Sequence, residues 1–200
     1  MIVKKHTLRG PVSTRRLRRG GFTLIETLVA VMILASAVVG PLSIASRSLS
    51  NSLVAKDQIS AFFLAQDAVE YVRFVRDSNR LKGADWLLGT GGSSAGIDLS
   101  PCATAGGCYV DSTMAVVGTG DVPTACDTTN GCPTLYYDSG NSRFTYVSSG
   151  TDISASLFTR TILLTDISTT EQKLTVTVSW SDVGNVTRSV MVYENIFKWQ

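Results

Sequence analysis

The amino-acid sequence predicts an α+β fold in which one long N-terminal helix packs on a C-terminal antiparallel β-sheet. An apolar run from Phe22 to Ala45 contains a single charge, Glu26, and an amphipathic segment free of Gly and Pro extends it as far as residue 82. The last third of the chain alternates apolar and hydroxyl side chains with a period of two, which is typical of half-buried strands. A sheet with one apolar face needs a covering layer, and the apolar stripe of the amphipathic segment can supply it.

The first 21 residues differ in charge from the rest of the chain. They contain seven of the 18 Lys and Arg residues and none of the 16 Asp and Glu residues, so the remainder has a net charge of −5. A basic stretch directly before an apolar span stays on the cytoplasmic side and sends the following chain outward. We interpret residues 1–21 as a leader that takes no part in the fold. The acidic remainder gives no support to nucleic-acid binding, which requires clustered Lys and Arg.

Residues 22–45 form the membrane-spanning half of the expected helix. At 1.5 Å per residue, 24 residues extend roughly 36 Å, which is enough to cross a bilayer. Gly40 and Pro41 interrupt the run, and a proline at this point is expected to kink or loosen the helix without necessarily ending it.

Residues 46–82 form the amphipathic half, and the whole helix is expected to run from about Phe22 to Leu81. Apolar side chains recur at helical spacing: Val54, Ala61, Leu64, Ala65, Ala68, Val72 and Val75. The opposite side carries charged residues, among which Glu70 with Arg73 and Arg73 with Asp77 are expected helix-neighbour pairs. Phe62 and Phe63 are adjacent and do not share a helical face, so one of them is available for subunit packing.

Residues 83–134 are rich in glycine and contain all four cysteines, and we expect loops here. Cys102, Cys108, Cys126 and Cys132 form two C-x5-C units, each with a glycine before its second cysteine. An even set of cysteines outside the cytoplasm favours disulfides. Of the three possible pairings the repeated spacing favours two local loops, 102–108 and 126–132. A zinc site is the competing interpretation, although structural zinc sites usually space their cysteines by two to four residues.

Residues 135–200 are expected to form the antiparallel sheet. Two short runs, 135–137 and 143–147, flank a turn sequence and indicate a hairpin. A further run covers 157–165, the clearest alternation covers 174–180, and a last run covers 187–193.

The segment Gly20-Gly21-Phe22-Thr23-Leu24-Ile25-Glu26, placed after an arginine-rich leader, resembles the processing site of type IV prepilins and of the related type II secretion pseudopilins. The resemblance implies that a membrane-embedded prepilin peptidase cuts between Gly21 and Phe22 and methylates the new amine of Phe22. It also implies a role for Glu26 in filament assembly and for Pro41 as a helix-breaking residue. It implies no cofactor and no catalytic residue in this chain.

The physical character of Glu26 agrees with this resemblance. A carboxylate inside a membrane span is costly, by roughly 2.5–3.5 kcal/mol at its centre on insertion scales, so its retention indicates a function. Cleavage after Gly21 creates an amine that can partner this carboxylate in a packed bundle. An ordinary signal peptide is the plainer alternative, with small-residue cut sites at 35–37 or 43–45. The acidic residue early in the apolar run argues against it.

Within the family, residues 61–77 look more like minor pilins than major ones. The function expected from this resemblance is therefore that of a structural subunit, of the minor kind, in a type IV pilus or a related filament. A minor pseudopilin of type II secretion or of a competence pseudopilus is the near alternative. A membrane-anchored adhesin is the more distant one, because residues 83–134 are the kind of loop segment that carries binding. An enzyme is disfavoured because the one histidine, His6, lies in the leader.

The expected partners are prepilin peptidase, other pilins or pseudopilins through the N-terminal helix, an inner-membrane assembly platform, and membrane lipid before assembly. The expected location is the inner membrane, crossed once with the C-terminal domain outside the cytoplasm, followed by an extracellular pilus or a periplasmic pseudopilus.

Overall fold

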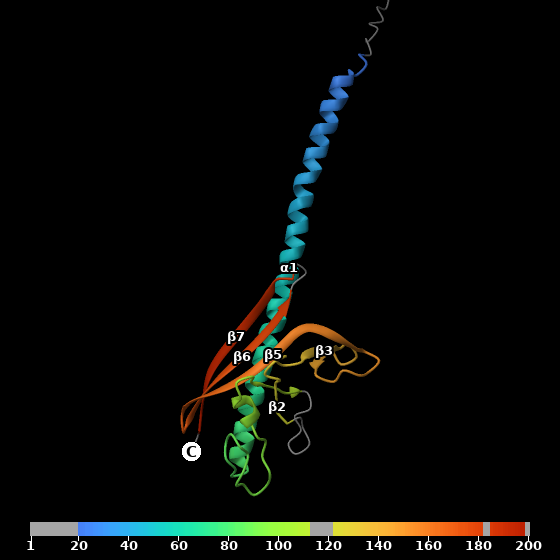
Figure 1. Cartoon of the computed structure of the whole chain (residues 1–200). Helices are drawn as coiled ribbons and strands as arrows, with labels where there is room; N and C mark the ends of the chain where they lie inside the picture. Colours follow the sequence, from blue (N-terminus) through green and yellow to red (C-terminus); the bar gives the residue numbers. More distant parts are fainter. Residues whose placement is uncertain (1–19, 113–121, 182–184, 199–200) are drawn as a thin grey trace, which may run out of the picture. The chain divides into compact units, whose positions relative to one another are not determined.

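A computed structural model describes residues 20–112, 122–181 and 185–198, so the expected leader lies outside the described residues except for Gly20 and Gly21. The chain divides into two compact units, residues 1–49 and 50–200. The elements, in order, are α1 (Leu24–Leu81), the 3-10 helix η1 (Ser100–Ala103), β1 (Cys108–Tyr109), β2 (Thr124–Ala125), β3 (Thr134–Asp138), β4 (Arg143–Thr145), β5 (Ile153–Ser168), β6 (Glu171–Ser181) and β7 (Thr187–Phe197) (Figure 1). The predicted α+β class is confirmed.

The sheet is antiparallel throughout, and β5 is its central strand. Along one edge β5 pairs with β6, which pairs in turn with β7. Along its other edge β5 pairs with β3, which continues to β4, and with β1, which continues to β2. The alternation expected at 174–180 is confirmed, because Leu174, Val176, Val178 and Trp180 are all buried. A two-residue period directs every second side chain of a strand to one face, so these four share the core face.

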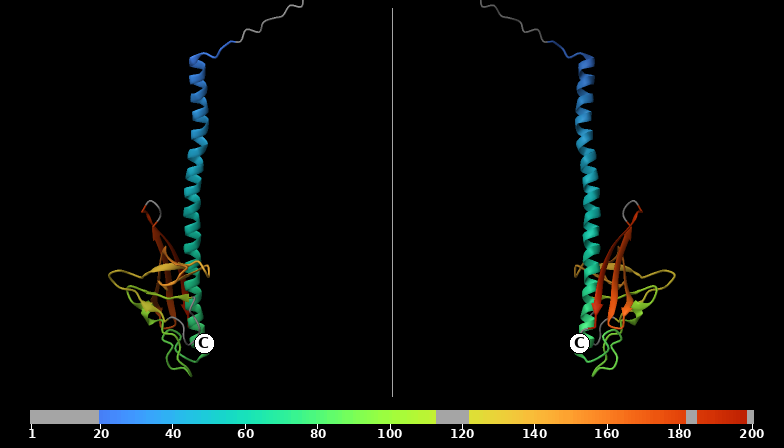
Figure 2. Two further views of the ribbon diagram at one scale, coloured as in Figure 1. Left: turned by 90° about the vertical axis from the view of Figure 1, so that its right-hand side faces the viewer. Right: turned by 90° about the vertical axis from the view of Figure 1, so that its left-hand side faces the viewer.

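The second half of α1 covers that core face (Figures 1 and 2). Its buried apolar residues recur every three or four positions and pack in one cluster with side chains of β5 and β6: Ala61, Leu64, Ala65, Ala68, Val69, Tyr71, Val72 and Val75. Of the stripe predicted from spacing, only Val54 is incompletely buried. Burial of apolar surface, worth about 25 cal/mol per Å², is therefore what joins helix to sheet.

A buried asparagine organises the end of α1. Gly83 has a positive φ of 70°, a conformation that commonly ends helices. Asn79, fully buried, donates from Nδ2 to the carbonyl of Ile97 at 2.8 Å and accepts from the Ile97 N–H at 2.9 Å. A neighbouring strand would form the same pair of hydrogen bonds with the backbone of Ile97. The Asn79 side chain therefore holds the glycine-rich chain after the helix in the way that a strand would.

Two features differ from the sequence-based expectation. The cysteine-containing segment is not only loop, because β1 and β2 belong to the sheet. Such two-residue strands are too short to produce a detectable alternation. The expected pair of Arg73 with Asp77 is also wrong: Arg73 contacts Glu70 and Glu194, whereas Asp77 contacts Arg76. The β7 carboxylate reaches Arg73 at 2.6 Å, and only the tertiary fold brings it there.

Candidate functional site

The start of α1 is the first candidate site, and Thr23 caps it. The backbone carbonyl of Thr23 accepts the N–H of Glu26 at 3.0 Å and the N–H of Thr27 at 3.2 Å. Its hydroxyl also accepts the Glu26 N–H, at 3.3 Å. A threonine at this position satisfies helix donors that have no carbonyl in a preceding turn, which stabilises the helix by typically about 1 kcal/mol.

The sequence-based interpretation missed this cap, in which Thr23 accepts the backbone N–H of Glu26. Thr23-Leu24-Ile25-Glu26 has the spacing of a capping box, in which a Thr is followed three residues later by a Glu. The carboxylate also lies in the first turn of α1, where the positive end of the helix dipole favours an anion. The Thr-x-x-Glu spacing was visible in the sequence and is the signal that would have revealed the cap.

The segment that follows Glu26 is apolar and uncovered within its own unit. Residues 20–49 are all exposed, including large side chains such as Phe22, Leu24 and Ile25. Among the described residues one helix, α1, is long and apolar enough to cross a membrane, and an 18-residue window of it has a mean hydropathy of 2.4. A fully exposed face of this size requires lipid or other helices around it.

Gly40 and Pro41 lie inside α1, and the helix continues through both. Proline deletes one backbone hydrogen bond of the ladder. The hydroxyl of Ser43 donates to the Gly40 carbonyl at 2.8 Å, close to the interruption. A helix-breaking role for this pair remains a prediction.

The four cysteines form two disulfides, Cys102–Cys108 and Cys126–Cys132. These are the local pairs that the repeated C-x5-C spacing favoured, and each sulfur is bonded to another sulfur rather than available to zinc. The two loops are adjacent in the sheet, since β1 begins at Cys108 and pairs with β2, which ends one residue before Cys126. Both bridges are buried.

A buried arginine ties α1 to this disulfide-bearing region. The side chain of Arg160, on β5, is only 2% exposed, and its Nη1 donates to Asp67 Oδ2 at 2.7 Å and to the Leu64 carbonyl at 3.0 Å. Its Nη2 donates to the Val110 carbonyl at 2.7 Å. Asp67 accepts a second hydrogen bond from the Ser112 hydroxyl. One guanidinium thus joins α1, β5 and the segment after β1.

The sequence contains a signal for the burial of this arginine. Arg160 lies two residues from Phe158 and from Ile162 on the same strand, and both of these are buried. A two-residue period therefore places Arg160 on the core face. A charge on a core face requires a partner, because burying an unpaired charge is very costly.

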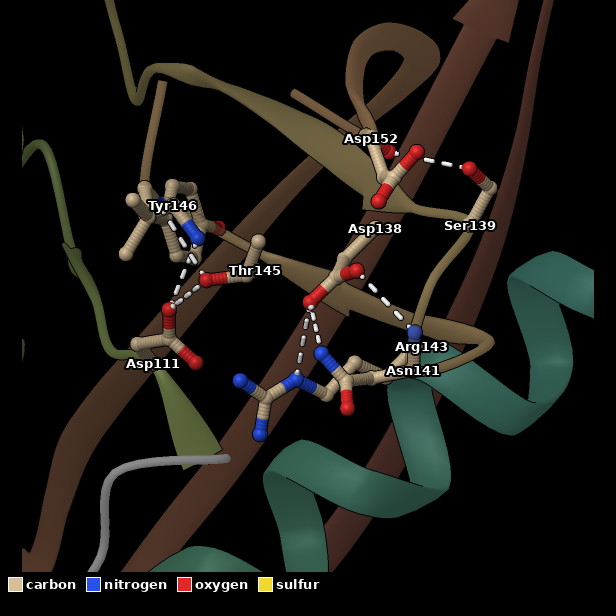
Figure 3. Close-up of polar contacts among 9 residues, drawn as sticks. Asp111, Asp138, Ser139, Asn141, Arg143, Thr145, Tyr146 and Asp152 are labelled. Carbon is tan, nitrogen blue, oxygen red and sulfur yellow. Dashed lines mark hydrogen bonds and ion pairs between the residues drawn. The ribbon is translucent and has the colours of Figure 1, made fainter. Parts of the chain in front are cut away.

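Two buried aspartates organise the strands around β4 (Figure 3). Asp111 accepts hydrogen bonds from the Thr145 hydroxyl and from the Tyr146 N–H, the latter at 2.8 Å. Asp138 accepts the Asn141 side-chain amide at 2.8 Å and lies 3.4 Å from Arg143 Nε. These contacts close the β3–β4 hairpin on itself and attach it to the segment after β1.

Hydrogen bonding and burial shift the pKa of three groups in this region. The Asn141 side chain, followed by its backbone N–H and Arg143, holds the pKa of Asp138 below its usual value against some desolvation. The backbone N–H groups of Asn130 and Thr129 lower the pKa of Asp127. Burial raises the pKa of the Tyr146 phenol. Within the described residues, no group of three or more His, Cys, Asp or Glu side chains is placed to hold a metal ion.

These features define a class of protein first. An exposed apolar helix of membrane-spanning length, with a lone carboxylate in its first turn, continues into a disulfide-containing α+β unit. This is the construction of a protein whose folded domain is attached to an apolar N-terminal helix.

Comparison with known families then gives the identity of the N-terminal segment. Residues 16–40 match the prokaryotic N-terminal methylation motif. Neither a curated protein nor a solved structure matches the chain significantly. The N-terminal segment is therefore similar to that of prepilin-type pilins and pseudopilins, and this motif is typical of chains that a prepilin peptidase processes.

Proposed function

We propose that this chain is a minor subunit of a type IV pilus or a related filament. A prepilin peptidase cuts it between Gly21 and Phe22, the amine of Phe22 is methylated, and the N-terminal helix then packs among those of other subunits. The observation that carries the proposal is the methylation motif at residues 16–40, which coincides with the start of an apolar helix that nothing in its own unit covers.

Glu26 supplies the polar contact of assembly in this proposal. Lipid tails give no hydrophobic drive between helices, so association depends on close packing and on polar contacts. The methylated amine of Phe22 remains basic and lies at the positive end of α1, where the helix dipole disfavours a cation. A carboxylate on a neighbouring subunit at 4 Å offsets this, by about 4 kcal/mol at an effective dielectric constant of 20. Only some axial offsets bring the two groups together, which sets the stagger between subunits.

Processing is tested by intact-mass and N-terminal analysis of membrane-extracted protein from cells with and without prepilin peptidase. We expect a chain that starts at Phe22 and is one methyl group heavier, seen only with the peptidase. Gly21→Leu is expected to abolish the cut, and Gly20→Leu is the matched control. A Cβ added at either glycine meets no atom within 4 Å, so folding is not the cause of a difference. A mature chain starting near Ser46, or an uncut chain, would contradict the proposal.

The assembly role is tested with Glu26→Gln, which keeps the shape of the side chain and removes its charge. We expect normal processing and at least a tenfold loss of this chain from sheared filaments, since losing an interaction of several kcal/mol in a desolvated site has a large effect on association. Glu70→Gln is the control, because Glu70 is an exposed carboxylate of the same helix. Unchanged incorporation of the Glu26 variant would remove the assembly role.

The minor status rests on the resemblance of residues 61–77 to minor pilins. Two charged residues of this segment hold the helix to its own domain: Asp67 contacts Arg160, and Arg73 contacts Glu194. Quantitative mass spectrometry of sheared filaments tests the assignment. A minor subunit is scarce relative to the principal filament protein, whereas an abundant one would contradict the assignment and leave the filament role intact.

A further inference from the structure

A tyrosine-lined hollow opens beside the first disulfide loop. It has a volume of about 470 Å³ and is lined by residues from β1, β2, β3 and the end of the β3–β4 hairpin, including Tyr109, Tyr136 and Tyr146. The rings of Tyr109 and Tyr146 lie 4.8 Å apart, and all three tyrosines are half-buried. Small-molecule sites typically have volumes of about 300–1,000 Å³.

A second hollow of about 390 Å³ borders the first. It is lined by the 126–132 disulfide loop, including Asn130 and Gly131. The two hollows share Tyr109 and Pro133 in their walls. The second disulfide loop and the strand that follows the first one therefore contribute to neighbouring hollows, and a ligand that contacts Tyr109 can reach both.

The charge of this surface excludes most ionic ligands. Among the described residues that line the two hollows there is no Lys, Arg or His, which leaves an anionic ligand without a counter-charge. The two carboxylates present are already engaged: Asp111 accepts from Thr145 and Tyr146, and Asp127 accepts the backbone N–H groups of Thr129 and Asn130 at 2.7 and 2.8 Å. A cationic ligand would have to compete with these bonds.

The remaining chemistry is that of aromatic faces beside neutral hydrogen-bonding groups. Thr124, Thr134 and Ser148 supply hydroxyls along the first hollow, and Asn130 supplies an amide in the second. Tyrosine combines a large apolar face with a polar tip, which suits ligands that present both C–H surfaces and hydroxyls. We propose that this surface binds an uncharged oligosaccharide that lies across Tyr109.

This proposal goes beyond the filament role and does not rest on it, because the site belongs to the unit formed by residues 50–200. Glycan binding at this surface would be the same whichever filament the chain joins. The test can therefore be carried out on the unassembled mature chain, so failure of assembly and failure of glycan binding are distinguishable.

The experiment is saturation-transfer NMR on the mature full chain in a detergent without a sugar headgroup. The probes are maltotriose, cellotriose, mannotriose and triacetylchitotriose, with spermine and inorganic phosphate as charged comparators. We expect at least one trisaccharide to bind with a Kd of about 1 mM or tighter, and the charged probes not to bind. Absence of binding by all four trisaccharides, or binding of spermine or phosphate alone, would overturn the proposal.

Two neighbouring tyrosines of β3 provide a matched pair of variants. Tyr136 lines the first hollow, whereas Tyr137 lies on the opposite face of the strand and packs on Phe144 with ring centroids 5.2 Å apart. We expect Tyr136→Ala to weaken trisaccharide binding by about tenfold or more, and Tyr137→Ala to change it less than about twofold. If Tyr136→Ala does not fold, Thr134→Arg tests the same point, since Thr134 is exposed and its replacement fills the hollow. Equal affinity in these variants would show that the sugar binds elsewhere.

Discussion

The guanidinium of Arg160 and the carboxylate of Asp67 lie 2.7 Å apart, yet one is buried and the other is half exposed. The side chain of Arg160 is 2% exposed, whereas that of Asp67 is 47% exposed. The pair therefore joins the core of the sheet to the surface of α1. Because water reaches only one partner, the two residues should respond differently to mutation.

The first prediction concerns this asymmetry. Asp67→Ala leaves a buried guanidinium without its counter-charge and is expected to lower the free energy of unfolding by about 3 kcal/mol. Arg160→Met removes the buried charge, leaves Asp67 in contact with water and leaves two carbonyls without this donor, so the expected loss is smaller, about 2 kcal/mol. Urea unfolding of both variants measures the two losses in the free energy of unfolding and shows which is larger.

The control for this pair is Glu70→Ala. Glu70 contacts Arg73 at 2.8 Å, but both side chains are exposed, 64% and 42% respectively. Exposed ion pairs contribute about 0–1 kcal/mol, so this variant should unfold almost as the parent does. A larger loss for Arg160→Met than for Asp67→Ala would contradict our account of the buried charge.

The second prediction separates two glycines at equivalent places in the disulfide loops. Gly107 and Gly131 each precede the second cysteine and have positive φ values of 68° and 77°. A Cβ at Gly107 would lie 2.6 Å from the Ile162 carbonyl oxygen, whereas a Cβ at Gly131 meets nothing within 4 Å. Gly131→Ala should cost only the conformational penalty of about 1–2 kcal/mol. Gly107→Ala should cost more, because β1 must also shift away from β5.

Thermal unfolding of the two alanine variants, with their disulfides intact, measures this difference. Mass analysis under non-reducing conditions checks that both bridges have formed. Equal destabilisation of the two variants would contradict this prediction. It would mean that β1 and β5 can accommodate a Cβ at residue 107 without a loss of stability.

The third prediction is an acid sensitivity due to Asp138. Its pKa is lowered in the folded protein, chiefly by the Asn141 side chain, so the folded state binds fewer protons than the unfolded state in the acid range. The resulting stability is present above the ordinary aspartate pKa of about 4 and is lost as the pH falls through the lowered folded value. Asn141→Ala should therefore flatten the decline of the unfolding free energy below about pH 4.

Urea unfolding between about pH 2 and 7 measures this slope, since that range extends well below the ordinary aspartate pKa of about 4. Asn51→Ala, at an exposed helix position, is the control and should keep the slope of the parent. An unchanged slope in the Asn141 variant would assign the acid sensitivity to other carboxylates, of which Asp127 also has a lowered pKa.

The fourth prediction concerns the cap of α1. Thr23→Ala removes the hydroxyl that accepts the Glu26 N–H, and the loss of about 1 kcal/mol should speed amide exchange at Glu26 about fivefold. Thr23→Ser should restore protection. Thr27→Ala is the control, because the Thr27 hydroxyl donates to the Leu24 carbonyl and does not cap the helix. Hydrogen exchange in detergent micelles measures all three, and equal exchange in the Thr23→Ala and Thr27→Ala variants would exclude the cap.

Much of the fold could be predicted because its patterns are local. The spacing of Ala61, Leu64 and Ala68 identified the core face of α1, and the alternation from Leu174 to Trp180 identified that of β6. The repeated C-x5-C spacing favoured the disulfide pairs that the structure contains. The Thr-x-x-Glu cap was equally local, but the sequence-based interpretation considered Glu26 only as a charge in a membrane span.

By itself, the sequence determined the character of the N-terminal segment, because the methylation motif and the apolar run depend only on the order of residues along a short segment. Helical and strand periodicities are equally short-range and determined the α+β class. The tertiary structure alone decided which charges meet: Arg73 with Glu194 and Arg160 with Asp67 are separated by 121 and 93 residues. The tyrosine-lined surface likewise depends on strand register across β1 and β3. Such contacts join residues that are far apart in the sequence, and they form only when the chain packs in three dimensions. A local sequence pattern therefore does not indicate which residues will meet.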